Sequence, residues 1–309
     1  MVSGSMTNQF TIKVPASTSN LGPGFDSIGL ALDLYNEYKF EILDGNLELE
    51  YSSNLGESEI PYSKENLVYR ALDYVFHKES KDTPSVKIHF EAGIPTTGGF
   101  GSSSTAIIAG LMAANKILAE PYDSETLLKI GTQLDGHPDN ISPGILGGLV
   151  VCIYANAELN YVNLPWDQNL FFVVITPDFK VPTAEARAIL PTQVDFPDAV
   201  FNIGYSSLLV AALAAKDTET LKKCFKDRIH QRYRAQLVPG MRYVLDAGVE
   251  AGAIGTMLSG AGSTLIAVVD NEKTAQTVAQ AMQTAWLQSS VKSEVRYLRA
   301  VDQGATIES

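Results

Sequence analysis

The sequence predicts an α+β protein built from two domains. Its 309 residues are enough for about two separate hydrophobic cores. Strand and helix patterns interleave along the chain, but not in the regular alternation that a doubly wound parallel sheet would require. Each half is expected to mix strands and helices. We divide the chain into residues 6–158 and 159–309, with the boundary near residues 155–165.

Each expected element rests on the spacing of its apolar residues, which differs between half-buried strands and helices. In the first half, a strand at residues 10–14 leads into a loop rich in proline, glycine and serine at residues 15–26. More strand sequence then reaches residue 42. The patterns further predict a helix that Asn66 opens, helices at residues 107–118 and 124–134, and strands at residues 86–90 and 148–154.

The second half repeats this mixture of elements. An apolar run at residues 170–177 has the length of a buried strand. A strand pair is expected around residues 257–269, where a β-hairpin explains the glycine turn at residues 259–264. The other expected elements are helices at residues 199–215, 218–225, 241–247 and 272–288, and a last strand at residues 294–298.

Composition argues against several classes of partner. The net charge of -12, with no basic run to offset it, disfavours nucleic acid. The longest apolar run, residues 145–155, is shorter than the ~20 residues of a membrane helix, and no secretory signal is apparent. Cys152 and Cys224 lie far apart in apolar stretches, which is typical of buried thiols in a reducing compartment. We therefore expect a cytoplasmic protein with no membrane partner.

The most informative segment is the loop Ile-Pro-Thr-Thr-Gly-Gly-Phe-Gly-Ser-Ser-Ser-Thr at residues 94–105, between a strand and a helix. A helix start offers unpaired N–H groups and the positive end of the macrodipole, and glycines let a phosphate approach the backbone. The loop lacks the lysine of a Walker motif and the later acidic residue of a Rossmann motif. It therefore indicates an anion site of another kind, or else a plain helix cap made by Ser102 or Ser103.

Three polar positions elsewhere suggest a second ligand. The segment His-Pro-Asp-Asn at residues 137–140 presents an imidazole, a carboxylate and a carboxamide. A closed zinc site is not expected, because the chain has four histidines and no pair at i, i+4. The segment is either a capped helix start or a loop that recognises a small zwitterion, and we favour the second. Arg187 and Arg234 would each bind a carboxylate or remain ordinary surface charges.

Taken together and in order, these segments resemble the GHMP kinase superfamily, most closely its homoserine kinase branch. The loop at residues 94–105 is similar to the superfamily's ATP-phosphate loop, and residues 258–264 are similar to its C-terminal glycine motif. The segment Asn-Leu-Gly-Pro-Gly-Phe-Asp at residues 20–26 matches the homoserine kinase branch, as do residues 136–140 and 185–191. Galactokinases and mevalonate kinases carry a Gly-Glu-His motif instead. The resemblance extends from Lys13 to about Val269.

The resemblance implies a two-domain GHMP kinase fold, with an N-terminal ribosomal-protein-like α+β domain and a C-terminal ferredoxin-like α+β domain. It implies transfer of the γ-phosphoryl of ATP, with Mg²⁺, to the hydroxyl of L-homoserine, a step in threonine biosynthesis, by a protein that is commonly a homodimer. The nucleotide contacts that it implies are made by Asn66, Pro95, Thr96, Thr97, Gly98, Gly99, Phe100, Gly101, Ser102, Ser103, Ser104 and Thr105.

The same resemblance assigns the amino-acid site and the metal. Homoserine would be held by Asn20, Asp26, His137, Asn140, Arg187 and Arg234. Catalytic roles fall to Asp26, which would orient the hydroxyl, and to Asn140 and Ser103. The implied magnesium ligands are Ser103, Gln133 and Asp135. Gln133 stands where the superfamily usually has a glutamate, and its neutral oxygen is a weaker ligand for a hard cation, so Asp135 is expected to take over that role.

Two departures from the phosphate-loop pattern are expected to leave activity intact. Phe100 replaces a preferred leucine, and Gly98 stands where homoserine kinases often have arginine. Two other functions stay open on the sequence alone. The chain would be a GHMP kinase for another small alcohol, such as a mevalonate-type acid, or a non-catalytic nucleotide or amino-acid sensor on the same fold.

Overall fold

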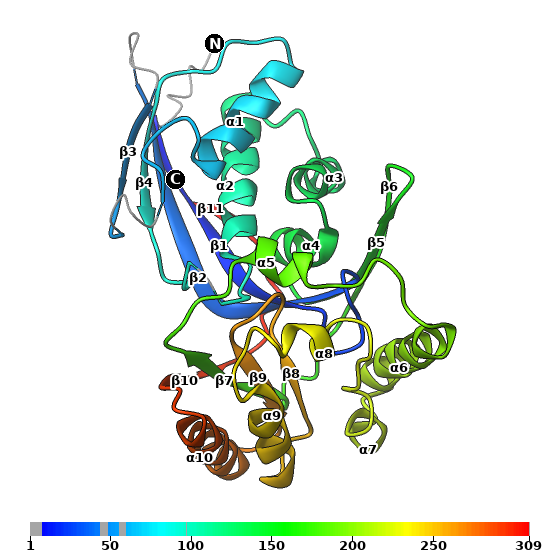
Figure 1. Cartoon of the computed structure of the whole chain (residues 1–309). Coiled ribbons are helices and arrows are strands. Elements are labelled where there is room, and N and C mark those ends of the chain that lie inside the picture. Colours follow the sequence, from blue (N-terminus) through cyan, green and yellow to red (C-terminus); the bar gives the residue numbers. More distant parts are fainter. Residues whose placement is uncertain (1–7, 44–48, 56–59, 97, 309) are drawn as a thin grey trace.

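The chain forms two β-sheets that each carry helices on one face, as Figure 1 shows. This computed structural model describes residues 8–43, 49–55, 60–96 and 98–308. The first sheet and helices α1 to α4 form the upper part of the figure, and the second sheet with α9 and α10 forms the lower part. The predicted α+β class is therefore confirmed.

The first sheet is organised around one long strand, β2. In the order β11-β1-β2-β4-β3, β2 pairs with β1 on one edge and β4 on the other, and its first residues also pair with β5, which in turn pairs with β6. Only β3 and β4 pair in parallel among these described strands. The strands are β1 (Gln9–Ser19), β2 (Ile28–Ile42), β3 (Leu49–Ser53), β4 (Val86–Glu91), β5 (Leu149–Ala155), β6 (Glu158–Leu164) and β11 (Thr306–Glu308).

Four helices cover one face of this sheet and enclose the first hydrophobic core. Helix α2 is the central one. It packs closely against α1, since a Cβ on Gly110 would lie 2.2 Å from the carbonyl oxygen of Val68. Asn66 caps α1 as predicted, because its side chain accepts a hydrogen bond from the backbone N–H of Val68. The helices are α1 (Leu67–Lys78), α2 (Ser102–Ile117), α3 (Ser124–Asp135) and α4 (Pro138–Leu146).

The second sheet has the strand order β10-β7-β9-β8 with antiparallel pairing, the arrangement of a ferredoxin-like domain. Alternate residues of β7 enter two different cores: Val173 packs toward α9 and α10, and Phe172 packs toward the first half of the chain. Both faces of β7 are thus buried, which explains its unbroken apolar sequence. The elements are β7 (Phe171–Pro177), β8 (Gly255–Leu258), β9 (Leu265–Val269), β10 (Ser293–Leu298), α9 (Met241–Glu250) and α10 (Glu272–Gln288).

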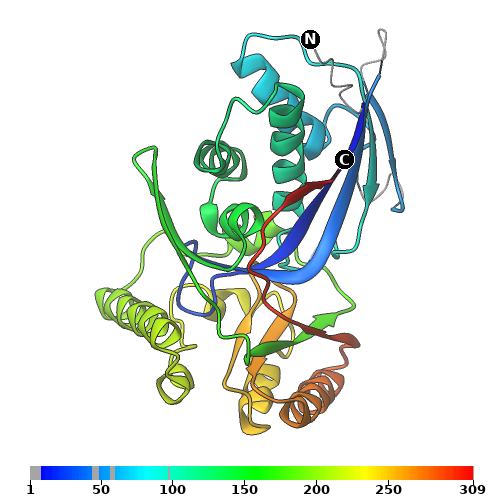
Figure 2. The same cartoon turned by 180° about the vertical axis from the view of Figure 1, so that it is seen from behind.

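The segment between β7 and β8 forms helices α5 (Thr183–Ala188), α6 (Phe196–Ala215), α7 (Thr218–Leu221) and α8 (Gln231–Arg234). Helix α6 lies at the periphery of the molecule (Figure 2). Among the described helices, α6 is the one that is long and apolar enough to cross a membrane by length and composition, and 28% of its apolar 18-residue window is buried. A helix of this kind in a protein of this size is weak evidence for a membrane span.

The structure differs from the sequence-based expectations in identifiable places. The strand predicted at residues 10–14 continues to Ser19, because Ala16 to Ser19 pair with the first residues of β2 after a shift of register between Pro15 and Ala16. The loop predicted at residues 15–26 therefore begins at Asn20. The segment predicted as a recognition loop at residues 137–140 is the start of helix α4. The elements β3, β6, β11, α5 and α8 were not predicted, being short or lacking a strong periodic pattern.

The predicted domain boundary at residue 158 remains a proposal, and the strand pairing of the first sheet suggests a different boundary. The boundary between residues 158 and 159 falls at the first residues of β6, which belongs to the first sheet. The last strand, β11, returns to pair with β1 at the edge of that sheet. We therefore propose that residues 9–164 and 306–308 form the first domain and that the second lies between them.

Candidate active site

A cavity of about 270 Å³ lies where the two halves of the chain meet. From the first half, the cavity is lined by the glycine-rich loop between β4 and α2, named the phosphate loop for the motif that it resembles, and by the start of α4. From the second half, it is lined by α5, α8 and the glycine turn after β8. The turn that follows β1 contributes Asn20 and Asp26. Segments that are far apart in sequence, each predicted to carry polar function, thus share one enclosure.

The phosphate loop presents the open end of helix α2 to this cavity. Gly98, Gly99 and Gly101 have positive φ angles of 135°, 84° and 68°, which turn the chain sharply into the helix. Gly101 is the N-cap residue, and no side chain caps the helix. The alternative in which Ser102 or Ser103 merely caps α2 is therefore wrong. The first-turn N–H groups of a 16-residue helix are left for an anion.

Buried side chains from both halves hold the loop in place. The amide of Asn36 on β2 accepts hydrogen bonds from the N–H groups of Gly93 and Ile94 and donates one to Thr105 Oγ1. From the second half, Ser259 Oγ donates to the carbonyl of Gly99 at 2.7 Å. A Cβ on Gly99 would lie 2.0 Å from the carbonyl oxygen of Ser259, so only glycine permits this approach.

Asp135, at the end of α3, lies beside the helix start. Its Oδ2 accepts a hydrogen bond from Ser104 Oγ at 2.8 Å and lies 3.7 Å from His137 Nδ1. Both contacts are made by Oδ2, and Oδ1 has no hydrogen-bond or ion-pair partner within the described part of the chain. Burial raises the pKa of Asp135, and the nearby His137 and the Ser104 hydrogen bond only partly offset this. A buried carboxylate with a free oxygen, next to an anion site, suits a divalent cation.

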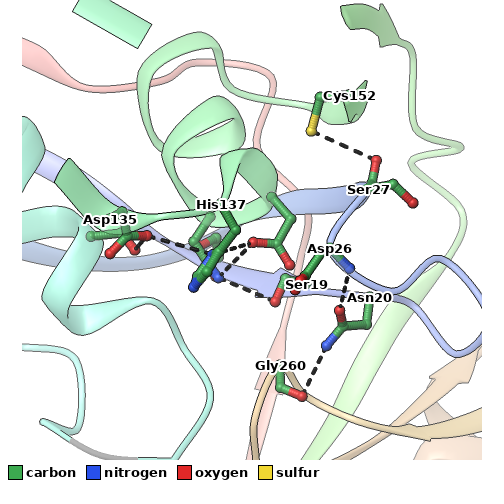
Figure 3. Close-up of polar contacts among 12 residues, drawn as sticks. Ser19, Asn20, Asp26, Ser27, Asp135, His137, Cys152 and Gly260 are labelled. Carbon is green, nitrogen blue, oxygen red and sulfur yellow. Dashed lines mark hydrogen bonds and ion pairs between the residues drawn. The ribbon is translucent and has the colours of Figure 1, made fainter. Parts of the chain in front are cut away.

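Asp26 and Arg187 form a two-pronged ion pair at the other side of the cavity. The two Arg187 nitrogens donate to the two Asp26 oxygens at 3.0 and 2.8 Å. The turn that carries Asp26 is fastened by Asn20, whose Oδ1 accepts from the N–H of Asp26 and whose Nδ2 donates to the carbonyl of Gly260, as Figure 3 shows. Asp26 itself has a left-handed φ of 54°. Asn20 thus fixes the position of a charged group.

Arg234 on α8 is a cation almost fully removed from solvent, with 2% of its surface exposed. Its Nε donates to the carbonyl of Ala186 at 3.1 Å and its Nη1 to the carbonyl of Gly260 at 2.9 Å. No carboxylate within the described chain forms an ion pair with it. Burial and the charge of Arg187 lower the pKa of Arg234 to about 10. An anionic ligand would supply the missing counter-charge.

The first residues of α4 complete the cavity. His137 Nδ1 lies 2.8 Å from Asp139 Oδ1 and points toward Asp135 as well (Figure 3). Burial lowers the pKa of His137, but the hydrogen bond to Asp139 and the charges of Asp139 and Asp135 outweigh it, so the net shift is upward. Asn140 is buried, accepts from Ser17 Oγ and donates to Ser19 Oγ. The start of α4 therefore presents polar side chains to the cavity.

Asp26, His137 and Asp139 form a second candidate metal site, because one ligand atom from each lies within 4.8 Å of the other two. Both Asp26 oxygens already accept from Arg187, and His137 Nδ1 is bonded to Asp139. Mg²⁺ prefers oxygen ligands, and this group would offer it a nitrogen and two engaged carboxylates. The pair formed by Ser104 and Asp135 fits magnesium better.

Comparison with known proteins identifies this arrangement. The family model for the GHMP kinases N terminal domain matches residues 66–148, and that for GHMP kinases C terminal matches residues 209–288. A homoserine kinase of Microchaete diplosiphon is 42% identical over 303 residues, covering 98% of both chains. The chain belongs to the homoserine kinase family of GHMP kinases. A homoserine kinase of Carboxydothermus hydrogenoformans is 38% identical, covering 95% of each chain.

Solved structures agree with this family assignment. The crystal structure of homoserine kinase from Cytophaga hutchinsonii superposes with a TM-score of 0.89 at 27% identity and covers 99% of each chain. A Leishmania major mevalonate kinase, solved with R-mevalonate, has a TM-score of 0.69 at 16% identity, covering 96% of each chain, which shows a shared fold alone. The predicted two-domain GHMP kinase fold is thereby confirmed.

Most described residues that the family resemblance singled out line the cavity, and three do not. Asn66 is held at the start of α1, where it also donates to the carbonyl of Pro61. Thr105 is buried beneath the loop, bonded to Asn36 and Tyr38. Gln133 is exposed on α3, about 200° around the helix from Asp135. Thr97 lies outside the described residues. The cavity is lined by Asn20, Asp26, Pro95, Thr96, Gly98, Gly99, Phe100, Gly101, Ser102, Ser103, Ser104, Asp135, His137, Asn140, Arg187 and Arg234.

Several residues of this homoserine kinase site could not be predicted from local sequence patterns. Asp139 stands inside a recognised motif, yet its pairing with His137 emerges only once α4 is formed. Asn36 and Ser17 lie in strands whose sequences do not mark either residue as part of a site. Their side-chain hydrogen bonds join residues that are 57 or more positions apart. A polar residue at an inward strand position was the one local hint, and Asn36 is such a residue, with 0% exposure.

Proposed function

We propose that this protein is an ATP-dependent homoserine kinase that transfers the γ-phosphoryl group to the side-chain hydroxyl of L-homoserine. One observation carries the proposal: a helix start without a side-chain cap and a buried arginine without a carboxylate partner among the described residues open into the same cavity. A small amino acid with a hydroxyl group would bind its carboxylate to this arginine and place its hydroxyl beside a phosphate bound at the helix start. The family membership supports this substrate, since the curated relatives are named homoserine kinases.

On the nucleotide side, the loop from Pro95 to Ser104 would hold the phosphates through backbone N–H groups and the helix dipole. The exposed hydroxyl of Ser103 and the hydroxyl of Ser104 both lie at this helix start. When bound, Mg²⁺ would neutralise charge on the phosphates, and Asp135 with one of these serines would hold it. Nucleotide contacts by Asn66 and Thr97 remain part of the proposal.

On the amino-acid side, Arg234 would bind the carboxylate of homoserine, with Arg187 beside it. Asp26 and the oxygens of the turn fastened by Asn20 would face the ammonium group. His137 would border the same ligand, because it lines the cavity between Asp26 and Asp135. The opposite charges of a zwitterion would thus each meet a fixed partner.

The chemistry itself needs positioning more than a strong base. Both oxygens of Asp26 accept from Arg187, which fits a carboxylate that orients a hydroxyl better than one that removes its proton. Asn140 is held by Ser17 and Ser19, so its place in the cavity is set before substrate binds. In-line alignment and charge neutralisation account for most catalysis of phosphoryl transfer.

A substrate panel tests the proposal. With ATP and Mg²⁺, L-homoserine should support ADP release with a kcat/KM about tenfold or more above that for L-serine, which is one methylene shorter, and mevalonate should support none above background. The measurement is coupled ADP detection with the three compounds side by side. A preference for mevalonate would point to another small-alcohol kinase, and ATP binding without homoserine-dependent ADP release would point to a sensor.

We further propose that the protein is a cytoplasmic homodimer with no nucleic-acid or membrane partner. Helix α6 offers a surface for this, the α6 stripe, which consists of the exposed residues Phe196, Val200, Ile203, Ser207, Leu208 and Ala211. The stripe has no charged residue, although the chain carries a net charge of -12. Two copies of an acidic protein would meet with least repulsion across such a face, while an anionic membrane surface would require basic residues.

The oligomeric state tests this surface. The wild-type protein should sediment as a dimer, and Ile203→Glu should shift it to monomer, because two buried carboxylates would face each other across the two-fold axis. Leu287→Glu, which changes an equally exposed apolar residue of α10, serves as the matched control and should stay dimeric. A monomeric wild type, or a dimer that survives Ile203→Glu, would rule out the α6 stripe as the interface.

A further inference from the structure

His230 immediately precedes α8 and is completely buried beside Arg234. Its Nε2 lies 2.8 Å from the carbonyl oxygen of Gly22, and its Nδ1 lies 3.3 Å from Nη1 of Arg234. A carbonyl can only accept a hydrogen bond and a guanidinium can only donate one. Both contacts are satisfied together by a neutral imidazole that carries its proton on Nε2, so the geometry assigns that tautomer.

The surroundings of His230 favour this neutral form. Burial lowers the pKa of His230, and the charge of Arg234 acts in the same direction, while the nearby carboxylates of Asp227 and Asp26 oppose it only in part. Asp227 is itself engaged, since it accepts hydrogen bonds from the backbone N–H groups of Ile229, His230 and Gln231. The hydrogen bonds to Asp227 therefore fix the turn that carries His230.

His230 also contacts the N-terminal turn that carries Asp26. The ring of Phe25 stacks on the imidazole with 5.2 Å between centroids. The guanidinium carbon of Arg234 lies 5.2 Å from the centre of the same ring, and that of Arg187 lies 5.8 Å from it. One imidazole thus joins the first-half turn, through Gly22 and Phe25, to a second-half arginine that has no carboxylate partner among the described residues.

We propose that His230 is a positioning residue that aims Arg234 at the carboxylate of the amino-acid substrate and sets its distance from the turn bearing Asp26. The proposal rests on the proposed function, because it presumes that this cavity binds an amino acid. His230 does not touch the substrate in this scheme. It acts by holding one of the terminal nitrogens of Arg234, so that the remaining nitrogen, Nη2, is presented to the ligand in one orientation.

Three variants of one position separate the two contacts. His230→Phe keeps an aromatic ring but removes both nitrogens. His230→Asn keeps an acceptor near the position of Nδ1, facing Arg234, and His230→Gln keeps a donor near the position of Nε2, facing Gly22. His77→Phe changes a solvent-exposed histidine of α1 and is the matched control. KM for L-homoserine, KM for ATP, kcat and the melting temperature are measured for each protein.

His230→Phe should raise the homoserine KM about tenfold or more, while the ATP KM and the kcat at saturating homoserine change by no more than about twofold. His230→Asn should recover most of this loss, and His230→Gln should recover less. An unchanged homoserine KM in His230→Phe, or equal increases for both substrates without recovery in His230→Asn, would overturn the assignment. If the wild type itself releases no ADP with homoserine, the proposed function fails instead, so the two failures are distinguishable.

Discussion

Replacing Asp135 by asparagine should lower kcat by about 10²–10³-fold while leaving the protein folded. The substitution keeps the size of the side chain and its capacity to accept from Ser104, but removes the negative charge beside the helix start. Charge on the transferred phosphoryl group would then be neutralised less well, because a neutral oxygen binds Mg²⁺ weakly. Titration of kcat against Mg²⁺ should show a higher half-saturating concentration, which distinguishes a ligand from a structural residue.

The neighbouring position provides the matched control. Gln133→Ala should leave kcat and the Mg²⁺ response unchanged, because Gln133 is exposed and does not line the cavity. Ser103→Ala and Ser104→Ala, measured in the same assay, show which hydroxyl assists Asp135. A loss of Mg²⁺ affinity in Gln133→Ala and not in Asp135→Asn would refute the metal assignment. If neither variant loses Mg²⁺ affinity, the metal is bound by other residues.

The contrast between Gln133 and Asp135 shows where sequence reasoning reaches its limit. Both residues sit in one short motif, and a family pattern favours the first as the ligand. Helix geometry favours the second in our proposal, because two residues along α3 are about 200° apart around the axis and only one can face α2. The family pattern therefore restricts the proposed metal ligand to one helical turn, and the orientation of α3 supports Asp135, which lines the cavity.

The phosphate loop was predictable as a candidate anion site because its sequence pattern is local. Glycines, hydroxyl residues and a following helix occur within 12 consecutive positions, so the pattern is complete in the sequence. Its support is not local. Asn36 and Ser259 hold the loop from 57 and 160 positions away, and nothing near either residue signals that partner. The return of β11 to the first sheet is likewise a long-range event that spacing patterns do not encode.

The loop at residues 15–26 shows a different limit. Its proline, glycine and serine content predicts a shaped loop. Pairing with β2 instead continues strand β1 to Ser19, and the turn begins after that residue. The hydroxyl residues that looked like loop residues are strand residues instead. The side chains of Ser17 and Ser19 contact Asn140, and that of Thr18 contacts Ser259. Tertiary pairing overrode local preference here, because β2 offered hydrogen bonds that a loop would have left to water.

Replacing Arg234 by alanine should raise the KM for L-homoserine about 100-fold or more, while the KM for ATP stays within about twofold. The reason is that Arg234 has 2% exposure, no carboxylate partner in the described chain and a place in the cavity wall, so a ligand carboxylate would be its counter-charge. Arg234→Lys should recover only part of the loss, because an ammonium keeps the charge but not the planar fork. Arg232→Ala, two residues away and partly exposed beside Asp198, is the matched control and should resemble the wild type.

A substrate lacking the carboxylate makes this prediction sharper. The amino alcohol 3-amino-1-propanol has the hydroxyl and amine of homoserine without its carboxylate, so it cannot pair with Arg234. The wild type should use it with a kcat/KM about 100-fold or more below that for homoserine, and Arg234→Ala should lower the homoserine value toward the amino-alcohol value without changing the latter. Equal losses for both compounds would mean that Arg234 supports the fold of the cavity through Ala186 and Gly260, and that the carboxylate is bound elsewhere.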